Sequence, residues 1–279
     1  MAADGERTGG AGARTSERAG WPAGLLLVRH GESTGNLADR AAHEASAEEL
    51  ELTERDADVP LSELGHRQAR AVGRELAAQV GRGEVGAPGV VLSSPYRRAR
   101  DTAAGVLAGS GLDVPLCLDE RLRERDLGWW DGLTGRGVRA RYPQESARRD
   151  RLGKMYYRPP GGESWCDVSL RVRSLLRDLR LDHAGRRVLV VTHQAVIMNF
   201  RLVLEDLGEE RLMELDRREP LANCSVTAYD GDADGMALRF AGSTAWVRRR
   251  DEPVTDDPVD DDRLGADDRH GTGRGGGAR

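Results

Sequence analysis

LLLVRHGESTGN, residues 25–36, is the stretch on which the fold depends, because four consecutive apolar residues are followed directly by Arg29 and His30. A short apolar run of this kind, bounded by glycines, is typical of a strand that is buried on both faces, as in a parallel sheet. Residues that follow such a strand lie at the carboxyl edge of the sheet, where α/β proteins bind their ligands. Here that edge has a guanidinium, an imidazole, two glycines, and small hydroxyl and amide groups. This set of groups suits a phosphate.

The composition indicates a globular chain without a membrane segment. The sequence has 279 residues, 38% of them hydrophobic, which is enough for one large domain or two small ones. No apolar run approaches the roughly 18 residues of a membrane span, and the N-terminus has no apolar core of the kind found in signal peptides. We therefore expect a cytoplasmic protein with no membrane partner. Three widely spaced cysteines without a CxxC pair favour buried thiols over disulfides or a metal site.

The net charge of −5 comes from one end of the chain. The residues from Asp251 onward include nine acids and four arginines, which leaves 38 basic and 38 acidic residues in the remainder. A protein that binds nucleic acid needs a basic excess on at least one face. The neutral body therefore argues against a nucleic-acid partner.

Strands and helices are expected to alternate, which predicts a mostly parallel sheet with helices on both faces. The expected strands are residues 24–28, 89–94, 114–118, 187–192, 224–229 and 236–241, and the expected helices begin near residue 60 and cover 97–108, 166–181 and 195–207. A further short helix is expected after Thr134, whereas residues 140–160 are expected to be irregular.

The two tails differ in composition from the body. Residues 1–22 and the acidic residues 250–279 have little apolar surface to bury, so we expect both to be disordered and residues 23–249 to form the catalytic domain. Within that domain, the charged segment 37–59 is expected to hold a short helix near 45–51. Such an insertion could cover the site, but its charge run favours a solvated excursion.

A second apolar strand also ends at a histidine. Residues 187–192, RVLVVT, lead into His193 in the same way that LLLV leads into Arg29 and His30. Either histidine alone could be a structural residue with satisfied hydrogen bonds. If the two strands are neighbours, both imidazoles emerge at one edge of the sheet, and the pair then favours a site.

Two further motifs join these histidines. SPYRRARDTA, residues 94–103, is similar to the SPxxRAxxTA pattern of the histidine phosphatase superfamily, which places Arg98 in a phosphate pocket. LRERDLG, residues 122–128, followed by WDGLT, resembles the element whose glutamate, Glu124 here, is the proton donor. RHGE itself resembles the phosphohistidine loop of that superfamily. The four motifs occur in the family's order, and the resemblance implies the three-layer α/β/α sandwich of phosphoglycerate mutase-like proteins.

The resemblance implies a covalent mechanism without a metal or another cofactor. Neutral His30 would attack phosphorus and form a phosphohistidine, and Glu124 would protonate the leaving oxygen and later take a proton from water. Donors around the phosphoryl oxygens would stabilise the charge of the transition state. The catalytic donors would be Arg29, Arg98 and His193, and the substrate-binding set at this end would be Arg29, Arg98, Thr34, Gly35 and Asn36.

The choice of substrate rests on finer resemblances. Phosphoglycerate mutases have Gly-Asn after the second histidine, whereas this chain has Gln194 and Ala195. HQAV and KMYYRPPGGES instead resemble the bisphosphatase half of the fructose-2,6-bisphosphate enzymes, and by that likeness Arg149, Lys154, Tyr157 and Gln194 could line the far end of the pocket. That family has an arginine where this chain has Met198, so the same sugar bisphosphate is not implied.

We therefore expect a phosphatase for another small phosphorylated metabolite. Two alternatives stay open, namely mutase-type phosphoryl transfer and a module that binds phosphorylated ligands without turnover. The oligomeric state is left open.

Overall fold

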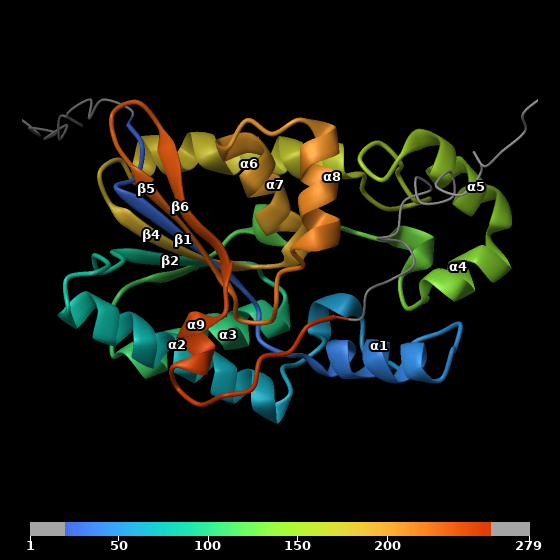
Figure 1. Ribbon diagram of the computed structural model, residues 1–279, viewed down its shortest axis with the longest axis horizontal. Helices are drawn as coiled ribbons and strands as arrows, with labels where there is room; N and C mark the ends of the chain where they lie inside the picture. The colour runs from blue at the N-terminus through green and yellow to red at the C-terminus, as the bar shows by residue number, and fades with distance from the viewer. Residues whose placement is uncertain (1–19, 258–279) are drawn as a thin grey trace, which may run out of the picture.

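The computed structural model describes residues 20–257. Six strands form one sheet in the order β3-β2-β4-β1-β5-β6. They are β1 (Gly24–Arg29), β2 (Val90–Ser93), β3 (Leu116–Leu118), β4 (Arg187–Thr192), β5 (Val226–Gly231) and β6 (Met236–Ser243). Strands β1 to β4 are parallel, whereas β5 is antiparallel to β1, and β6 to β5. The sheet is mixed but mostly parallel, as the sequence predicted (Figure 1).

The described helices are α1 (Thr34–Glu44), α2 (Glu63–Gly81), α3 (Arg97–Ser110), α4 (Gly135–Arg141), α5 (Pro143–Leu152), α6 (Trp165–Asp182), α7 (Gln194–Leu204), α8 (Glu209–Arg218) and α9 (Ala245–Arg248). Three short 3₁₀ turns, η1 (Asp56–Asp58), η2 (Glu120–Leu122) and η3 (Gly128–Trp130), interrupt the loops. None of the helices within residues 20–257 is long and apolar enough to cross a membrane.

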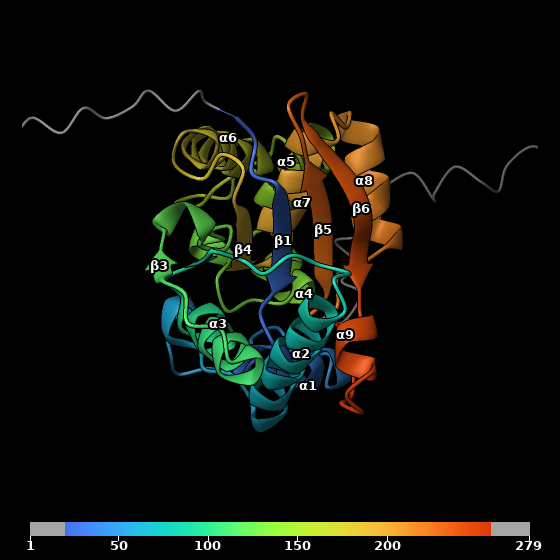
Figure 2. The same cartoon turned by 90° about the vertical axis from the view of Figure 1, so that its left-hand side faces the viewer.

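Side chains of the central strand β1 alternate between two cores. Leu25 and Leu27 belong to one buried cluster with residues of α6 and α7, and Leu26 and Val28 belong to a second cluster with residues of α2 and α3. Burying each aliphatic side chain contributes roughly 1.5–3 kcal/mol to folding. Helices therefore cover both faces of the sheet, which confirms the expected three-layer α/β/α sandwich (Figure 2).

Three further helices, α1, α4 and α5, lie beyond the carboxyl ends of the parallel strands, away from the two helical layers (Figure 1). Segment 45–59 lies in the same region, because the backbone nitrogen of Leu50 donates to the oxygen of Gly132 at 2.9 Å, and that of Thr134 to Glu48 at 3.1 Å. Residues 48–50 thus contact the segment around residue 133, whereas most other residues of 37–59 are exposed or half-buried, as expected for a solvated excursion.

Two helical assignments need correction. Within 37–59 the helix is α1 rather than residues 45–51, because Ser33 caps it: the Ser33 hydroxyl accepts from the backbone nitrogen of Asn36, and the Asn36 side chain accepts in return from that of Ser33. Residues 140–160, expected to be irregular, contain α5, which begins with Pro143 in its first turn, where a missing N–H costs nothing.

The three cysteines have no disulfide partners, but only Cys224 is buried. Cys166 is half-buried, and Cys117 is exposed because it lies on β3, an edge strand whose three residues all face solvent. The expectation of buried thiols therefore holds for one cysteine of the three.

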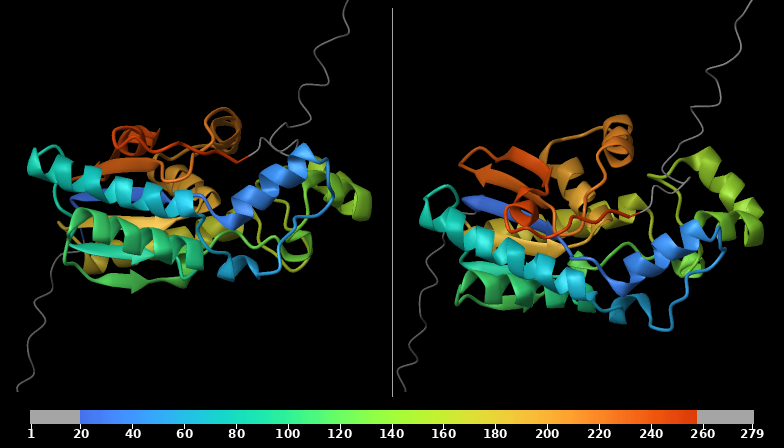
Figure 3. Two further views of the ribbon diagram at one scale, coloured as in Figure 1. Left: turned by 90° about the horizontal axis from the view of Figure 1, so that it is seen from below. Right: turned by 60° about the horizontal axis from the view of Figure 1, so that its bottom comes forward.

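The folded body extends beyond the boundary expected at residue 250. Val254 packs against the core beneath α2 and α3. Thr255 and Asn223 form two hydrogen bonds of 2.9 Å each: the Asn223 backbone nitrogen donates to the Thr255 backbone oxygen, and the Thr255 hydroxyl donates to the Asn223 side chain. Gln68 donates to Pro253 at 2.9 Å. Figures 1 and 3 show this last segment running from α9 toward α1. The rest of the two expected tails, residues 1–19 and 258–279, lies outside the described residues.

A chain that ends at Arg250 should be less stable than one that ends at Asp257. It would lose the packing of Val254 and leave Gln68 and Asn223, both buried, without these hydrogen-bond partners. We expect a loss of about 2–4 kcal/mol in the free energy of unfolding. Urea denaturation of the two chains measures the difference. Equal unfolding midpoints and slopes would show that residues 251–257 add nothing to the fold.

Candidate active site

The two histidines emerge side by side at the carboxyl edge of the sheet. β1 and β4 are parallel neighbours, with Arg29 opposite Thr192, so the residues that follow them meet. The imidazole centroids of His30 and His193 are 5.1 Å apart at an interplanar angle of 61°. Both rings are almost fully buried. The sequence analysis expected both imidazoles at one edge of the sheet if the two strands are neighbours, and the structure meets that condition.

Hydrogen bonding fixes the proton on His30. Its Nδ1 lies 2.8 Å from the carbonyl oxygen of Gly31, and a carbonyl can only accept, so the proton is on Nδ1 and the lone pair is on Nε2. Burial, and then the positive charges of Arg98 and Arg29, hold the pKa of His30 well below its ordinary value. His30 is therefore a neutral imidazole with Nε2 available as a nucleophile.

A close backbone approach places Gly31 beside this histidine. A Cβ on Gly31 would lie 2.7 Å from the carbonyl oxygen of Gly65, at the start of α2. The Gly31 nitrogen donates to the Thr102 hydroxyl at 3.0 Å, and that hydroxyl donates to the backbone oxygen of Arg98 at 2.7 Å. The loop after β1 is thus tied directly to the first turns of α3, which bring Arg98 to the site.

The two arginines are buried and each contacts a carboxylate. Arg29 donates to the backbone oxygen of Leu221 and to Asp257 Oδ2, the latter at 2.5 Å. Arg98 lies 2.8 Å from Asp56 Oδ1 and also donates to the Asp56 backbone oxygen. Among the described residues, Arg29 Nε is buried without a hydrogen-bond partner. The site therefore has anion-binding donors that two acids of the chain itself engage.

Asn36, Thr34 and Gly35 lie in the first turn of α1. Asn36 Nδ2 donates to Asp257 Oδ1 at 2.6 Å, so one carboxylate bridges Asn36 and Arg29. The Thr34 nitrogen donates to the oxygen of Pro60 at 3.0 Å, and Gly35 lies against Val59. Of this predicted set, the structure brings Asn36 to Arg29, whereas the contacts of Thr34 and Gly35 are with the segment before α2.

His193 is held by the second motif. Its Nε2 lies 2.9 Å from the Ser94 hydroxyl, and the ring of Tyr96 packs edge-on against it at 5.3 Å. Burial, and then the charge of Arg98, lower the pKa of His193 well below its ordinary value. Among residues 20–257, its Nδ1 is one of the buried polar atoms left without a partner. Such an orphan atom can still accept or donate one hydrogen bond.

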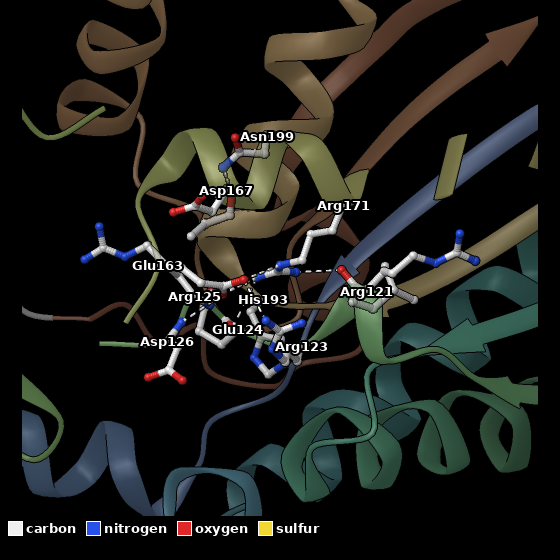
Figure 4. A network of polar contacts seen from close by, with 12 residues as sticks. Arg121, Arg123, Glu124, Arg125, Asp126, Glu163, Asp167, Arg171, His193 and Asn199 are labelled. Carbon is white, nitrogen blue, oxygen red and sulfur yellow. Dashed lines mark hydrogen bonds and ion pairs between the residues drawn. The ribbon is translucent and has the colours of Figure 1, made fainter. Parts of the chain in front are cut away.

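Glu124 follows η2 in a loop that a polar network holds in place (Figure 4). Arg171 donates to the backbone oxygens of Arg121 at 2.6 Å and Glu124 at 3.3 Å, and it pairs with Glu163 at 3.1 Å. The Thr192 hydroxyl donates to the oxygen of Leu122 at 2.7 Å, which ties the loop to the end of β4. These contacts fix the backbone on both sides of Glu124.

The Glu124 carboxyl is set up as an acid. Burial raises its pKa above the ordinary value, although a hydrogen bond from the Arg125 nitrogen at 2.8 Å and the charge of Arg98 oppose the shift. A raised pKa keeps the carboxyl protonated to higher pH than usual. Glu124 can therefore donate a proton where an ordinary glutamate would be ionised.

A cavity of about 250 Å³ opens beside Arg29 and Glu124. Its lining combines apolar side chains, namely Leu127, Trp130, Leu133, Val138 and Trp165, with polar ones, namely Arg125, Arg149, Lys154, Gln194, Asp216 and Asp257. Three of the four predicted distal residues, Arg149, Lys154 and Gln194, thus line it. Tyr157 is placed differently. Its ring stacks on Trp130 with centroids 5.0 Å apart, and its hydroxyl donates to Glu145 at 2.8 Å.

Sequence reasoning missed three acids of the site. Asp56, Asp216 and Asp257 come from η1, from α8 and from the segment after α9. Each lies in a charge-rich stretch that no motif distinguishes. Within residues 20–257, no group of three or more His, Cys, Asp or Glu side chains is arranged to hold a metal ion.

The family follows from comparison with known proteins. A family model described as the histidine phosphatase superfamily (branch 1) matches residues 25–244, which are most of the chain. The chain belongs to the histidine phosphatase superfamily. The matched region includes His30, Arg98, Glu124 and His193.

Similar superfamily members include both mutases and phosphatases. The 2,3-bisphosphoglycerate-dependent phosphoglycerate mutase 2 of Gloeobacter violaceus is 33% identical over 218 residues, or 76% of this chain and 87% of the relative. A bifunctional protein of Mycobacterium tuberculosis is 34% identical over 229 residues, which are 82% of this chain and 56% of that protein, so the chain spans about half of its length. The solved mycobacterial glucosyl-3-phosphoglycerate phosphatase in complex with VO3 has a TM-score of 0.62 and 29% identity, with coverage of 79% of this chain and 99% of that one. That enzyme has also been solved with inorganic phosphate.

Proposed function

We propose that this superfamily member is a phosphomonoester hydrolase for a small phosphorylated metabolite, acting through a phosphohistidine on His30. The observation that carries the proposal is the contact between His30 Nδ1 and the Gly31 carbonyl, which leaves Nε2 as the free nitrogen of the ring. His30 has its proton on Nδ1 and its lone pair on Nε2, and the Glu124 carboxyl beside the cavity has a raised pKa. The first step of hydrolysis requires a nucleophile with a free lone pair and an acid that can give up a proton, and a raised pKa extends the pH range over which Glu124 can serve as that acid.

The two steps balance without another reactant. In the first, His30 Nε2 forms a bond to phosphorus while the bond to the alcohol oxygen breaks, and that oxygen takes the proton of Glu124. In the second, water attacks phosphorus, the N–P bond breaks, and the Glu124 carboxylate takes a proton from the water. Arg29, Arg98 and His193 would hold the phosphoryl oxygens, where charge develops in the transition state.

Mutase-type phosphoryl transfer is the second candidate, because the Gloeobacter mutase is among the similar proteins. Two observations favour hydrolysis. The residue after His193 is Gln194, which lines the cavity together with Lys154, as in the sequence pattern of the fructose-2,6-bisphosphatase-like enzymes. The polar end of this cavity also contains Asp216, whose ion pair with Lys154 leaves less positive charge there to attract the carboxylate of phosphoglycerate.

The ratio of two products tests the proposal. The purified chain is given 2,3-bisphosphoglycerate and 3-phosphoglycerate, and inorganic phosphate and 2-phosphoglycerate are measured in parallel, followed by a panel of phosphorylated metabolites. We expect phosphate release to exceed isomerisation. Faster formation of 2-phosphoglycerate would establish the mutase instead. Binding of phosphorylated ligands without turnover of any ester would leave only the third alternative, a non-catalytic binding module.

Asp257 should compete with phosphate for the same donors. Its carboxylate occupies Arg29 and Asn36, so a bound phosphate has to displace it. Replacing Asp257 by alanine should therefore tighten inhibition by orthophosphate by about tenfold. In that variant no carboxylate occupies Arg29 and Asn36, so both are always free to bind phosphate. The measurement is the inhibition constant of orthophosphate.

The matched control for that change is Asp256→Ala. Asp256 is exposed, and its substitution removes the same charge one residue away. An equal effect in both variants would mean that the change in net charge, and not the position of Asp257, causes the tighter inhibition. An unchanged inhibition constant in Asp257→Ala would contradict competition between Asp257 and phosphate.

On the acid side of its pH profile, kcat/KM should fall at a lower pH than it would if the nucleophile had the pKa of an ordinary histidine. Protonation removes the Nε2 lone pair, so activity falls as the pH drops through the pKa of His30. Burial, followed by Arg98 and Arg29, lowers that pKa below its ordinary value of about 6.5. The kcat/KM profile reports the free enzyme. Two esters with different phosphate pKa values separate ionisation of the substrate from that of the enzyme. An enzyme limb above pH 6.5 would contradict a depressed pKa.

A further inference from the structure

Asp216 is a buried carboxylate in the wall of the cavity, and the mechanism above does not use it. It lies on α8, is 1% exposed, and lines the same cavity as Arg29 and Glu124. A charge buried to this extent is normally retained only where partners satisfy it. Its partners therefore indicate what it does.

Two of the predicted distal residues donate to Asp216. Lys154 Nζ lies 2.7 Å from Oδ2, and Gln194 Nε2 lies 3.2 Å from Oδ1. The ammonium of Lys154 also lies 5.2 Å from the centre of the Trp165 ring. The positive charge of Lys154 is thus compensated by Asp216 within the cavity wall. Lys154 therefore attracts a second anion, such as a second phosphate of the substrate, less strongly.

Asp216 also determines which atom Gln194 presents. An ionised carboxylate only accepts hydrogen bonds, so the amide nitrogen of Gln194 must face it and the amide oxygen must point elsewhere. Among the residues the structure describes, Gln194 Oε1 is buried and has no hydrogen-bond partner. A buried acceptor without a donor costs free energy that a ligand with a suitably placed hydroxyl would recover. A phosphate dianion has only acceptors and cannot fill this role.

We propose that Asp216 sets the substrate class of this site, by orienting Gln194 and neutralising Lys154, so that the cavity selects phosphomonoesters whose alcohol part carries hydroxyl groups over bisphosphates. The proposal rests on the proposed function, because it concerns the alcohol end of the same cavity. It differs from what the resemblance to fructose-2,6-bisphosphatases implies for Lys154 and Gln194, since a second phosphate is disfavoured there. Arg125 and Arg149 also line the cavity, so a bisphosphate has to be part of the test.

Binding to the His30→Ala variant tests this without turnover. Dissociation constants are measured by calorimetry for glucose 6-phosphate, glucose 1,6-bisphosphate and n-hexyl phosphate. We expect glucose 6-phosphate to bind at least about tenfold more tightly than n-hexyl phosphate, because the latter leaves the Gln194 acceptor unpaired. We also expect it to bind more tightly than the bisphosphate. Adding Asp216→Asn should shift the ratio of the two sugar phosphates toward the bisphosphate by about tenfold.

Two further variants keep the test decisive. Glu214→Gln, on the same helix, removes a charge whose ion pairs are with Arg211 and Arg218, so it should leave the ratio unchanged. Gln194→Leu removes the acceptor and leaves Asp216 in place. It should abolish the preference for glucose 6-phosphate over n-hexyl phosphate, and it keeps the role of the Gln194 acceptor testable if Asp216→Asn does not fold. The proposal would be overturned if the His30→Ala protein bound the bisphosphate more tightly than glucose 6-phosphate. It would also be overturned if the preference for glucose 6-phosphate over n-hexyl phosphate persisted in Gln194→Leu. If these ratios hold while no ester is hydrolysed, the hydrolase fails and the assignment of Asp216 stands.

Discussion

Replacing His30 by alanine should abolish turnover and the covalent intermediate together, with a loss of kcat on the order of 10⁴-fold or more. In the proposed mechanism the N–P bond forms on His30 Nε2. The hydrogen bond of the other ring nitrogen, Nδ1, to the Gly31 carbonyl leaves the lone pair on Nε2. His193 cannot substitute readily, because its Nε2 contacts the Ser94 hydroxyl. The two effects therefore have one cause and should appear in the same variant.

The measurement uses substrate labelled in its phosphoryl group. The reaction is quenched in alkaline denaturant, since the N–P bond of phosphohistidine is labile in acid, and the label on the protein is located by mass spectrometry. His183→Ala is the control, because it removes an imidazole at the end of α6, near the opposite end of β4. Label that persists in His30→Ala would refute the assignment of the nucleophile, whatever the effect on turnover.

The sequence predicted the centre of the site because its signals are local. β4 has the bounds expected from its apolar run, and β1 extends one residue beyond them. The parallel pairing that joins His30 to His193 follows from those two strands being central and buried on both faces. Arg98 and Glu124 were found through family resemblance, since neither is distinguishable from its charged neighbours by periodicity.

The surroundings of the site could not be predicted in the same way. About a third of the residues are charged, 32% by composition, so a single aspartate has no local signal. Asp56 and Asp257 lie 42 and 228 positions from their arginine partners, and only the folded chain brings them together. The helix α1 was misplaced for a related reason: its start depends on a reciprocal hydrogen bond between Ser33 and Asn36 rather than on apolar spacing.

Replacing Glu124 by glutamine should slow hydrolysis of an alkyl phosphate by roughly 10²–10⁴-fold, the usual range for losing a general acid–base group. The amide keeps the size of the side chain and can still accept from the Arg125 nitrogen, so binding of phosphate should be retained. What is lost is the proton that the raised pKa of Glu124 keeps available for the leaving oxygen. Glu120→Gln is the control, since Glu120 is an exposed acid at the start of the same loop.

The choice of ester distinguishes this role from a structural one. Nitrophenolate leaves without a proton, so formation of the phosphoenzyme from p-nitrophenyl phosphate should lose far less in Glu124→Gln than formation from an alkyl phosphate. The second step gains nothing from the better leaving group, because water must still be deprotonated there. Stopped-flow measurement should therefore show a burst of nitrophenolate followed by a slow steady rate, with labelled His30 accumulating. Equal losses in the first step for both esters would mean that Glu124 shapes the loop rather than moves the proton, and an undiminished rate would assign the acid to another group.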